Sequence, residues 1–165
     1  MGTGKSSVGL AVASLLEFEF VDTDQLIETR AGRPIARIFG EEGEAAFRTY
    51  ERVIVANLAT LQRTVIATGG GLGANLENLA SLRTHALIVC LWASPEVILE
   101  RVGRQSHRPL LQVPNPDERV RELLAEREPV YRQADVLVNT GTRPLREVAH
   151  QVAHHFQLSL GQSAK

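Results

Sequence analysis

The residues with the clearest capacity for chemistry open the chain, in the segment Gly2-Thr3-Gly4-Lys5-Ser6-Ser7. They match the end of the phosphate-loop pattern G-x-x-x-x-G-K-[ST], whose first glycine would fall before Met1. Glycines let backbone amides approach phosphate oxygens, and a helix N-terminus adds partial positive charge. Lys5 would hold the β- and γ-phosphates and Ser6 a Mg²⁺ ion. The segment predicts a nucleotide-phosphate site, and the helical apolar pattern that follows argues against the alternative of a disordered N-terminus.

A second candidate site comes one predicted helix later, at Asp22-Thr23-Asp24. An extended backbone places residues i and i+2 on the same side, so both carboxylates could face the phosphate loop. Near phosphates and Mg²⁺, one acid could order the water shell of the metal while the other accepts a proton from a substrate hydroxyl. The structural alternative is that Asp24 caps the helix after it. The pair is weak evidence by itself, but its position after a phosphate loop favours a functional role.

Glycines and arginines supply the remaining candidates. Gly69-Gly70-Gly71 follows the apolar segment 65–68 and could bring backbone amides close to a ligand, although a tight turn is the structural alternative. Arg48, Arg108 and Arg132 carry guanidinium groups that match carboxylates and phosphates, although most arginines only solvate a surface. Spacing alone does not show that Arg48 and Arg132 converge.

Apolar segments that alternate with amphipathic ones must position these residues. The predicted strands are 19–21, 64–68, 86–92 and 136–139. The predicted helices are 6–16, 25–31, 34–39, 42–61, 75–83, one that starts at Ser94, 118–128 and 144–156. A polar loop is expected over 103–117 and a disordered tail over 159–165. The alternation predicts an α/β fold with a parallel sheet, helices on both faces and ligands at the carboxyl ends of the strands.

Composition limits the classes of protein that are possible. The 165 residues are 44% hydrophobic and 22% charged, which suits one globular domain, expected over 1–158. A net charge of −1 gives no electrostatic footprint for nucleic acid or an anionic membrane. The single Cys90 excludes a disulfide within the chain, and we expect a cytoplasmic protein without a membrane span. His150, His154 and His155 fit a solvated helix face better than a metal site.

In combination these motifs resemble the shikimate kinase family of small phosphate-loop enzymes. Besides the first two sites, the resemblance depends on three longer motifs and one dipeptide, in the family's order: Gly43-Glu44-Ala45-Ala46-Phe47-Arg48, Thr68-Gly69-Gly70-Gly71, Arg108-Pro109-Leu110-Leu111 and Tyr131-Arg132. It implies a three-layer kinase fold with strand order 2-3-1-4-5. The family's first strand precedes the phosphate loop and is absent from this chain. We therefore expect a gap between the strand that ends at Thr68 and the strand that starts at Ala86.

The resemblance also implies a reaction, the ATP-dependent phosphorylation of the shikimate 3-hydroxyl, with Mg²⁺ as the metal and a monomeric enzyme. It implies that Lys5 holds the transferred phosphoryl group. Ser6 would bind Mg²⁺ directly, and Asp22 would do so through water. Asp24 would bind the substrate hydroxyls and act as the base.

Further roles follow for the rest of the chain. Helices within 25–61 would form the substrate side, where Arg48 and Arg132 clamp the shikimate carboxylate and Gly69, Gly70 and Gly71 offer backbone contacts. The loop 103–117 would be a lid. Two alternatives remain: a related small-molecule kinase such as a gluconate kinase, and a catalytically inactive nucleotide-binding module. The residues implied on the nucleotide side are Arg108 over the phosphates, Arg101 stacked on adenine, and Arg143-Pro144 on its other side.

Overall fold

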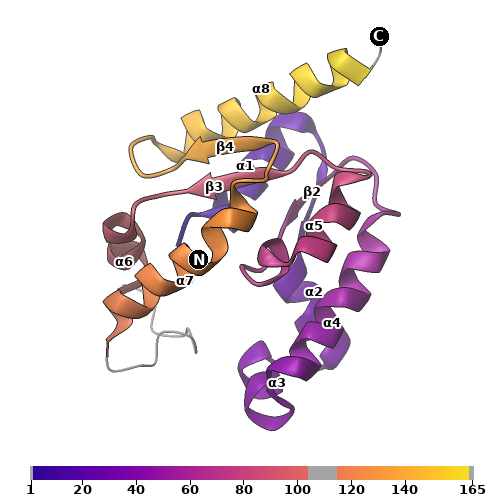
Figure 1. Ribbon diagram of the computed structural model, residues 1–165. Coiled ribbons are helices and arrows are strands. Elements are labelled where there is room, and N and C mark those ends of the chain that lie inside the picture. Colours follow the sequence, from indigo (N-terminus) through magenta and orange to yellow (C-terminus); the bar gives the residue numbers. More distant parts are fainter. Residues whose placement is uncertain (1, 104–114, 164–165) are drawn as a thin grey trace.

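The computed structural model describes residues 2–103 and 115–163, and its strands and helices alternate as predicted (Figure 1). The strands are β1 (Glu19–Asp22), β2 (Thr64–Ala67), β3 (Val89–Trp92) and β4 (Val136–Asn139). The helices are α1 (Lys5–Leu16), α2 (Thr23–Ala31), α3 (Ile35–Glu41), α4 (Gly43–Leu58), α5 (Leu76–Arg83), α6 (Pro95–Gly103), α7 (Pro116–Tyr131) and α8 (Leu145–Ser163), with a short 3-10 helix η1 (Leu72–Ala74). None of these helices is long and apolar enough to cross a membrane.

The strands pair in parallel, as an α/β fold of this kind requires. β1 lies beside β2, with Asp22 opposite Ala67, and β3 lies beside β4, with Trp92 opposite Asn139. Within the described residues these pairs form two separate two-stranded sheets. The gap expected between the second and third strands is therefore present. Because the pairing is parallel, the carboxyl ends of β1 and β2 meet at one edge, where the acid pair and the three glycines follow.

Alternate side chains of β2 show how the layers are arranged. Val65 packs with the cluster of α1, β4 and α8, which contains Val12 and Val148. Ile66, on the other face, packs with the cluster that α2, α3 and α4 share, which contains Ile27 and Ile54. Helices therefore cover both faces of the strands, which confirms the predicted three-layer arrangement. Figure 1 shows α1 and α8 on one side and the α3–α4 pair projecting on the other.

Local sequence explains most helix boundaries. Asp22 caps α2 by accepting a hydrogen bond from the Asp24 amide at 3.0 Å, and Gly32 ends that helix with a φ of 66°. Asn75 caps α5 in the same way by accepting from the Asn78 amide. These caps fix the carboxyl end of β1 and the segment after the three glycines, both of which border the candidate site.

Two helices run further than predicted. α7 continues through Pro129 to Tyr131, because the proline falls in the last turn and the Arg132 amide still bonds to the Glu128 carbonyl at 2.9 Å. α8 continues to Ser163, since no proline interrupts it and the Ser159 hydroxyl donates to the Phe156 carbonyl. The prediction of disorder is wrong for 159–163. The predicted loop 103–117 is also too long, because α6 includes Gly103 and α7 begins at Pro116.

Candidate active site

The phosphate loop has the backbone geometry of an anion cradle. Gly2 and Gly4 have φ angles of 68° and 83°, a region that glycine occupies without steric cost. α1 begins immediately at Lys5, and the Gly4 carbonyl accepts from the Val8 amide at 2.8 Å. The first amides of α1 are therefore directed at the space in front of the loop, together with the positive end of the helix dipole.

Ser6 and Asp22 are in direct contact, which joins the loop to the end of β1. The Ser6 hydroxyl donates to Asp22 Oδ2 at 2.8 Å, and the other carboxylate oxygen of Asp22 caps α2. A hydroxyl and a carboxylate side by side supply oxygen ligands of the kind that Mg²⁺ prefers. The structural alternative for the acid pair assigned the cap to Asp24, and that assignment is wrong. Asp22 is the cap, and Asp24 lies in the first turn of α2 rather than on an extended strand.

The three glycines lie against the acid pair and Arg48. A Cβ at Gly69 would collide with the carboxylate of Asp24, and a Cβ at Gly71 would collide with the guanidinium of Arg48. Gly71 has an ordinary φ of −76°, so a Cβ there would be opposed by the close Arg48 guanidinium and not by backbone strain. The Gly69 amide donates to the buried hydroxyl of Thr23 at 2.9 Å. The segment thus brings a predicted base and a predicted substrate-binding arginine to neighbouring positions.

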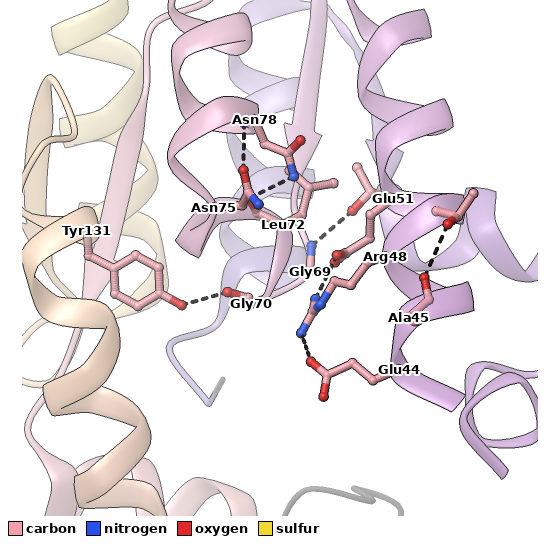
Figure 2. A network of polar contacts seen from close by, with 12 residues as sticks. Glu44, Ala45, Arg48, Glu51, Gly69, Gly70, Leu72, Asn75, Asn78 and Tyr131 are labelled. Atoms are coloured by element: carbon pink, nitrogen blue, oxygen red, sulfur yellow. Dashed lines mark hydrogen bonds and ion pairs between the residues drawn. The ribbon is translucent and has the colours of Figure 1, made fainter. Parts of the chain in front are cut away.

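Arg48 is held by two carboxylates of its own helix, α4 (Figure 2). Its Nη1 donates to Glu51 at 2.7 Å and its Nη2 to Glu44 at 2.6 Å. Burial would lower the pKa of Arg48, but the hydrogen bonds with Glu51 and Glu44 outweigh it and raise that pKa. Arg48 therefore carries a full positive charge beside Gly71.

Glu51 is the unexpected member of this cluster, because its side chain is only 2% exposed. Burial raises the pKa of the Glu51 carboxyl, the ion pair with Arg48 lowers it, and the nearby Asp24 raises it further. Its Oε1 is buried and has no hydrogen-bond partner among the described residues. A buried polar atom without a partner is costly and calls for an explanation.

The end of α7 closes the cluster from the opposite side. The Tyr131 hydroxyl donates to the Gly70 carbonyl at 2.8 Å, so α7 contacts the same glycines that Asp24 and Arg48 touch (Figure 2). Arg132 is the next residue, and its Nε and Nη2 bond to Glu128 at 2.8 and 2.6 Å. The Arg132 side chain is 73% exposed. The structure thus brings Arg48 into direct contact with Gly71. Arg132 follows the tyrosine that bonds to Gly70, but its own guanidinium is paired with Glu128, so its convergence with Arg48 stays a prediction.

The predicted nucleotide residues divide into three groups. The Arg101 guanidinium joins the loop to the end of β4, since it donates to the Thr140 carbonyl at 2.7 Å and to the Gly2 carbonyl at 3.4 Å. Arg143 is exposed and bonds to Gln151. Gln151 lies on α8, the helix that begins directly after Pro144. Arg108 lies outside the described residues. Adenine stacking by Arg101 and Arg143-Pro144 stays a prediction.

Sequence reasoning gave no role to four residues that the structure places in or beside the cluster. Thr23 stands between the two aspartates, and its buried hydroxyl accepts from the Gly69 amide. Glu51 falls on the apolar face of α4 between Phe47 and Ile54, and a charged residue in such a stripe is a signal of a buried partner. The other two are Glu44, which pairs with Arg48, and Tyr131.

Comparison with known proteins gives one consistent family. The shikimate kinase family model matches residues 1–157. A shikimate kinase of Caldanaerobacter subterraneus subsp. tengcongensis is 47% identical over 156 residues, which cover 94% of this chain and 91% of that protein. One of Thermodesulfovibrio yellowstonii is 44% identical over 157 residues, with 95% and 91% covered.

Solved structures agree. The shikimate kinase of Acinetobacter baumannii in complex with shikimate has a TM-score of 0.90 at 39% identity, covering 100% of this chain and 91% of that one. The Aquifex aeolicus enzyme has a TM-score of 0.82 at 38% identity, with 99% and 94% covered. A gluconokinase of Sinorhizobium meliloti, at a TM-score of 0.58 and 22% identity, covers 96% of this chain and 92% of that one, and it shares only the fold.

Proposed function

Because this chain belongs to the shikimate kinase family, we propose that it transfers the γ-phosphoryl group of ATP to the 3-hydroxyl of shikimate. The observation that carries the proposal is that the glycine segment contacts both the predicted base and a predicted carboxylate-binding arginine. Asp24 lies against Gly69, and Arg48 lies against Gly71. The segment that follows β2 therefore contacts an acid that can take a proton at one glycine, and a cation that can bind a carboxylate two residues later.

The transfer needs positioning and charge neutralisation more than covalent chemistry by the protein. The new bond forms between the shikimate 3-oxygen and the γ-phosphorus, and the bond from that phosphorus to the β–γ bridging oxygen breaks, releasing ADP. Asp24 is the group proposed to take the hydroxyl proton. Lys5 and the first amides of α1 are proposed to hold the transferred group, where their positive charge opposes the charge on its oxygens.

A divalent metal belongs to the same proposal. The contact of the Ser6 hydroxyl with the Asp22 carboxylate is the feature that suits Mg²⁺, with Ser6 as a direct ligand and Asp22 acting through water. Bound there, the ion would neutralise charge on the β- and γ-phosphates. Asp22 also caps α2, so the residue that would order the metal water shell also sets the start of the helix that carries Asp24.

The substrate carboxylate is assigned to Arg48 and Arg132. A guanidinium can match a carboxylate with two parallel hydrogen bonds, which an ammonium cannot do. Arg48 already pairs with two carboxylates, through one hydrogen bond to Glu51 and one to Glu44. Gly69, Gly70 and Gly71 are proposed to offer backbone contacts, with the Gly69 amide committed to Thr23. We further propose that the segment between α6 and α7 is a lid whose Arg108, which lies outside the described residues, closes over the phosphates. We also propose that the enzyme is a cytoplasmic monomer.

A coupled assay of ADP release tests the reaction directly. The purified chain is given ATP and Mg²⁺ with shikimate, gluconate or a nucleoside monophosphate, and the product is examined by ³¹P NMR. We expect ADP release that depends on shikimate and a phosphate ester at its 3-hydroxyl. Turnover with gluconate alone would assign the chain to the related kinase activity. ATP binding without turnover on any acceptor would make it a nucleotide-binding module.

A further inference from the structure

One contact of the glycine segment has no role in the chemistry proposed so far. Tyr131 lies in the last turn of α7, and its hydroxyl reaches 61 positions back along the chain to donate to the Gly70 carbonyl at 2.8 Å. We infer that Tyr131 is a positioning residue for the substrate pocket, whose hydroxyl fixes Gly70 and so keeps the backbone of Gly69 and Gly71 in register with Asp24 and Arg48. This inference rests on the proposed function.

The glycine segment needs an outside restraint because glycine has an unusually free backbone. Gly69 and Gly71 have no side chains through which packing could hold them, and Asp24 and Arg48 lie where a Cβ would be placed. Thr23 holds one side by accepting from the Gly69 amide at 2.9 Å. Tyr131 holds the middle from the opposite direction. The backbone is therefore held at the Gly69 N–H from α2 and at the Gly70 carbonyl from α7. Figure 2 shows Tyr131 approaching from the side opposite to α4.

The surroundings of Tyr131 suit a fixed donor. Burial raises the pKa of the Tyr131 hydroxyl, against the opposing effect of Arg127, so the group keeps its proton at neutral pH. Its ring borders a cavity of only about 20 Å³ with Ile98, Val120 and Leu123. Apolar side chains of α6 and α7 thus form a wall beside Tyr131, with Arg127 as the charged member of the lining.

The same wall connects Tyr131 to the nucleotide side. Ile98 and Val120 pack together between α6 and α7, and α6 also carries Arg101, which donates to the Gly2 carbonyl in the phosphate loop. One packed unit therefore contacts both the loop and the glycines. Because the bond from Tyr131 ends on Gly70, the effect of removing it should fall on the substrate that the glycines face, not on ATP.

The chain contains two tyrosines, and this gives a matched experiment. Tyr131→Phe removes the hydroxyl bonded to Gly70. Tyr50→Phe removes the same group from α4, where Tyr50 lines a separate groove with Arg30 and Val53 and its hydroxyl is hydrogen-bonded to Arg33. Both variants and the wild type are compared for the KM of shikimate, the KM of ATP, kcat and Tm. The same atom is lost in each, so only its location differs.

We expect Tyr131→Phe to raise the shikimate KM roughly 5- to 10-fold, the effect of one buried hydrogen bond, and to leave the ATP KM within about twofold. Tyr50→Phe should leave both constants within about twofold of the wild type. A fall in Tm with an unchanged shikimate KM would overturn the inference, because the bond would then only stabilise the fold. Equal rises in both KM values would also overturn it.

Failure of this inference can be told apart from failure of the proposed function. A wild-type chain that turns over a different acceptor refutes the function, and the Tyr131→Phe comparison is then made with that acceptor. The glycines would still have to be positioned, so the same selective rise in the acceptor KM is expected. A chain that only binds ATP would overturn both.

Discussion

The two halves of the candidate active site are held by different means. In the phosphate half, Gly4, Ser6 and Asp22 are fixed by backbone geometry and short contacts at 2.8 and 3.0 Å, all within or next to the first turn of a helix. In the acid-binding half, Arg48 and Arg132 are long side chains, and each is paired at 2.6 Å with a carboxylate four residues earlier on its own helix.

The two halves differ in whether their binding groups are free or already paired before the ligand binds. The phosphate half is preformed, so phosphate oxygens meet amides that already point at them. In the acid-binding half, Glu44 and Glu128 occupy guanidinium groups that a substrate carboxylate would use. Exposed ion pairs at this spacing contribute little stability, so exchanging the partner costs little. Selective damage to each half should therefore appear in different kinetic constants.

The largest effect is expected from a substitution of Asp24, which lies between the phosphate half and the acid-binding half. Asp24→Asn removes the proposed proton acceptor and keeps the shape of the side chain. We expect kcat to fall by at least about 100-fold, because general-base catalysis contributes on that order or more. ATP binding, measured by calorimetry, should stay within about threefold. A variant with near-normal kcat would remove Asp24 from the role of base.

A smaller effect, confined to the acid-binding half, is expected from Arg132→Ala. The shikimate KM should rise roughly 10- to 100-fold through the loss of a charge-assisted hydrogen-bond pair, with the ATP KM changed less than about threefold. Arg37→Ala is the matched control, since Arg37 pairs with Glu41 at the same helical spacing and is 67% exposed, against 73% for Arg132. Equal rises in the KM of both substrates for Arg132→Ala would contradict the carboxylate clamp.

The glycine segment, where the two halves meet, should give a still smaller effect. Gly71→Ala places a Cβ where the Arg48 guanidinium now lies, at a position with an ordinary φ of −76°. Arg48 is flexible at its tip, so we expect it to move, with the Tm within a few degrees of the wild type and a rise of roughly 3- to 10-fold in the shikimate KM. Gly40→Ala is the control, because nothing lies within 4 Å of its added Cβ. An unchanged shikimate KM would show that the position of Arg48 is not critical.

The same contrast explains what could be predicted from the sequence. The phosphate loop and the alternation of strands and helices are local patterns, so the order of elements followed from them. The neighbours of each strand were implied only by the resemblance to the family. The roles of Thr23 and Tyr131 could not be found in this way. Their partners, Gly69 and Gly70, are distant in sequence, and no sequence pattern shows which backbone group a hydroxyl will bond to. Pro129 misled the prediction of the end of α7 because a proline in the last turn removes only one backbone hydrogen bond.

Glu51 gives the smallest and most specific test of the acid-binding half. Burial raises the pKa of its carboxyl, so the folded protein holds this proton more tightly than the unfolded chain does. The corresponding stabilisation is complete below the ordinary value of 4.5 and is lost as the pH rises through the raised pKa. Glu51→Gln has no carboxyl at this position, so its stability does not show this loss as the pH rises. We therefore expect the Tm advantage of the wild type over Glu51→Gln to shrink, by a few degrees at most, as the pH is raised from about 4.5.

Glu44→Gln makes the comparison specific to burial. It removes a carboxylate from the same guanidinium of Arg48, but from a side chain that is 65% exposed against 2% for Glu51. Thermal unfolding of the wild type and both variants across a pH series checks the expectation. A Tm difference between wild type and Glu51→Gln that stays constant with pH would mean that the ion pair with Arg48 fully offsets burial. Glu51 would then be a simple partner of Arg48, and the acid-binding half would be as firmly preformed as the phosphate half.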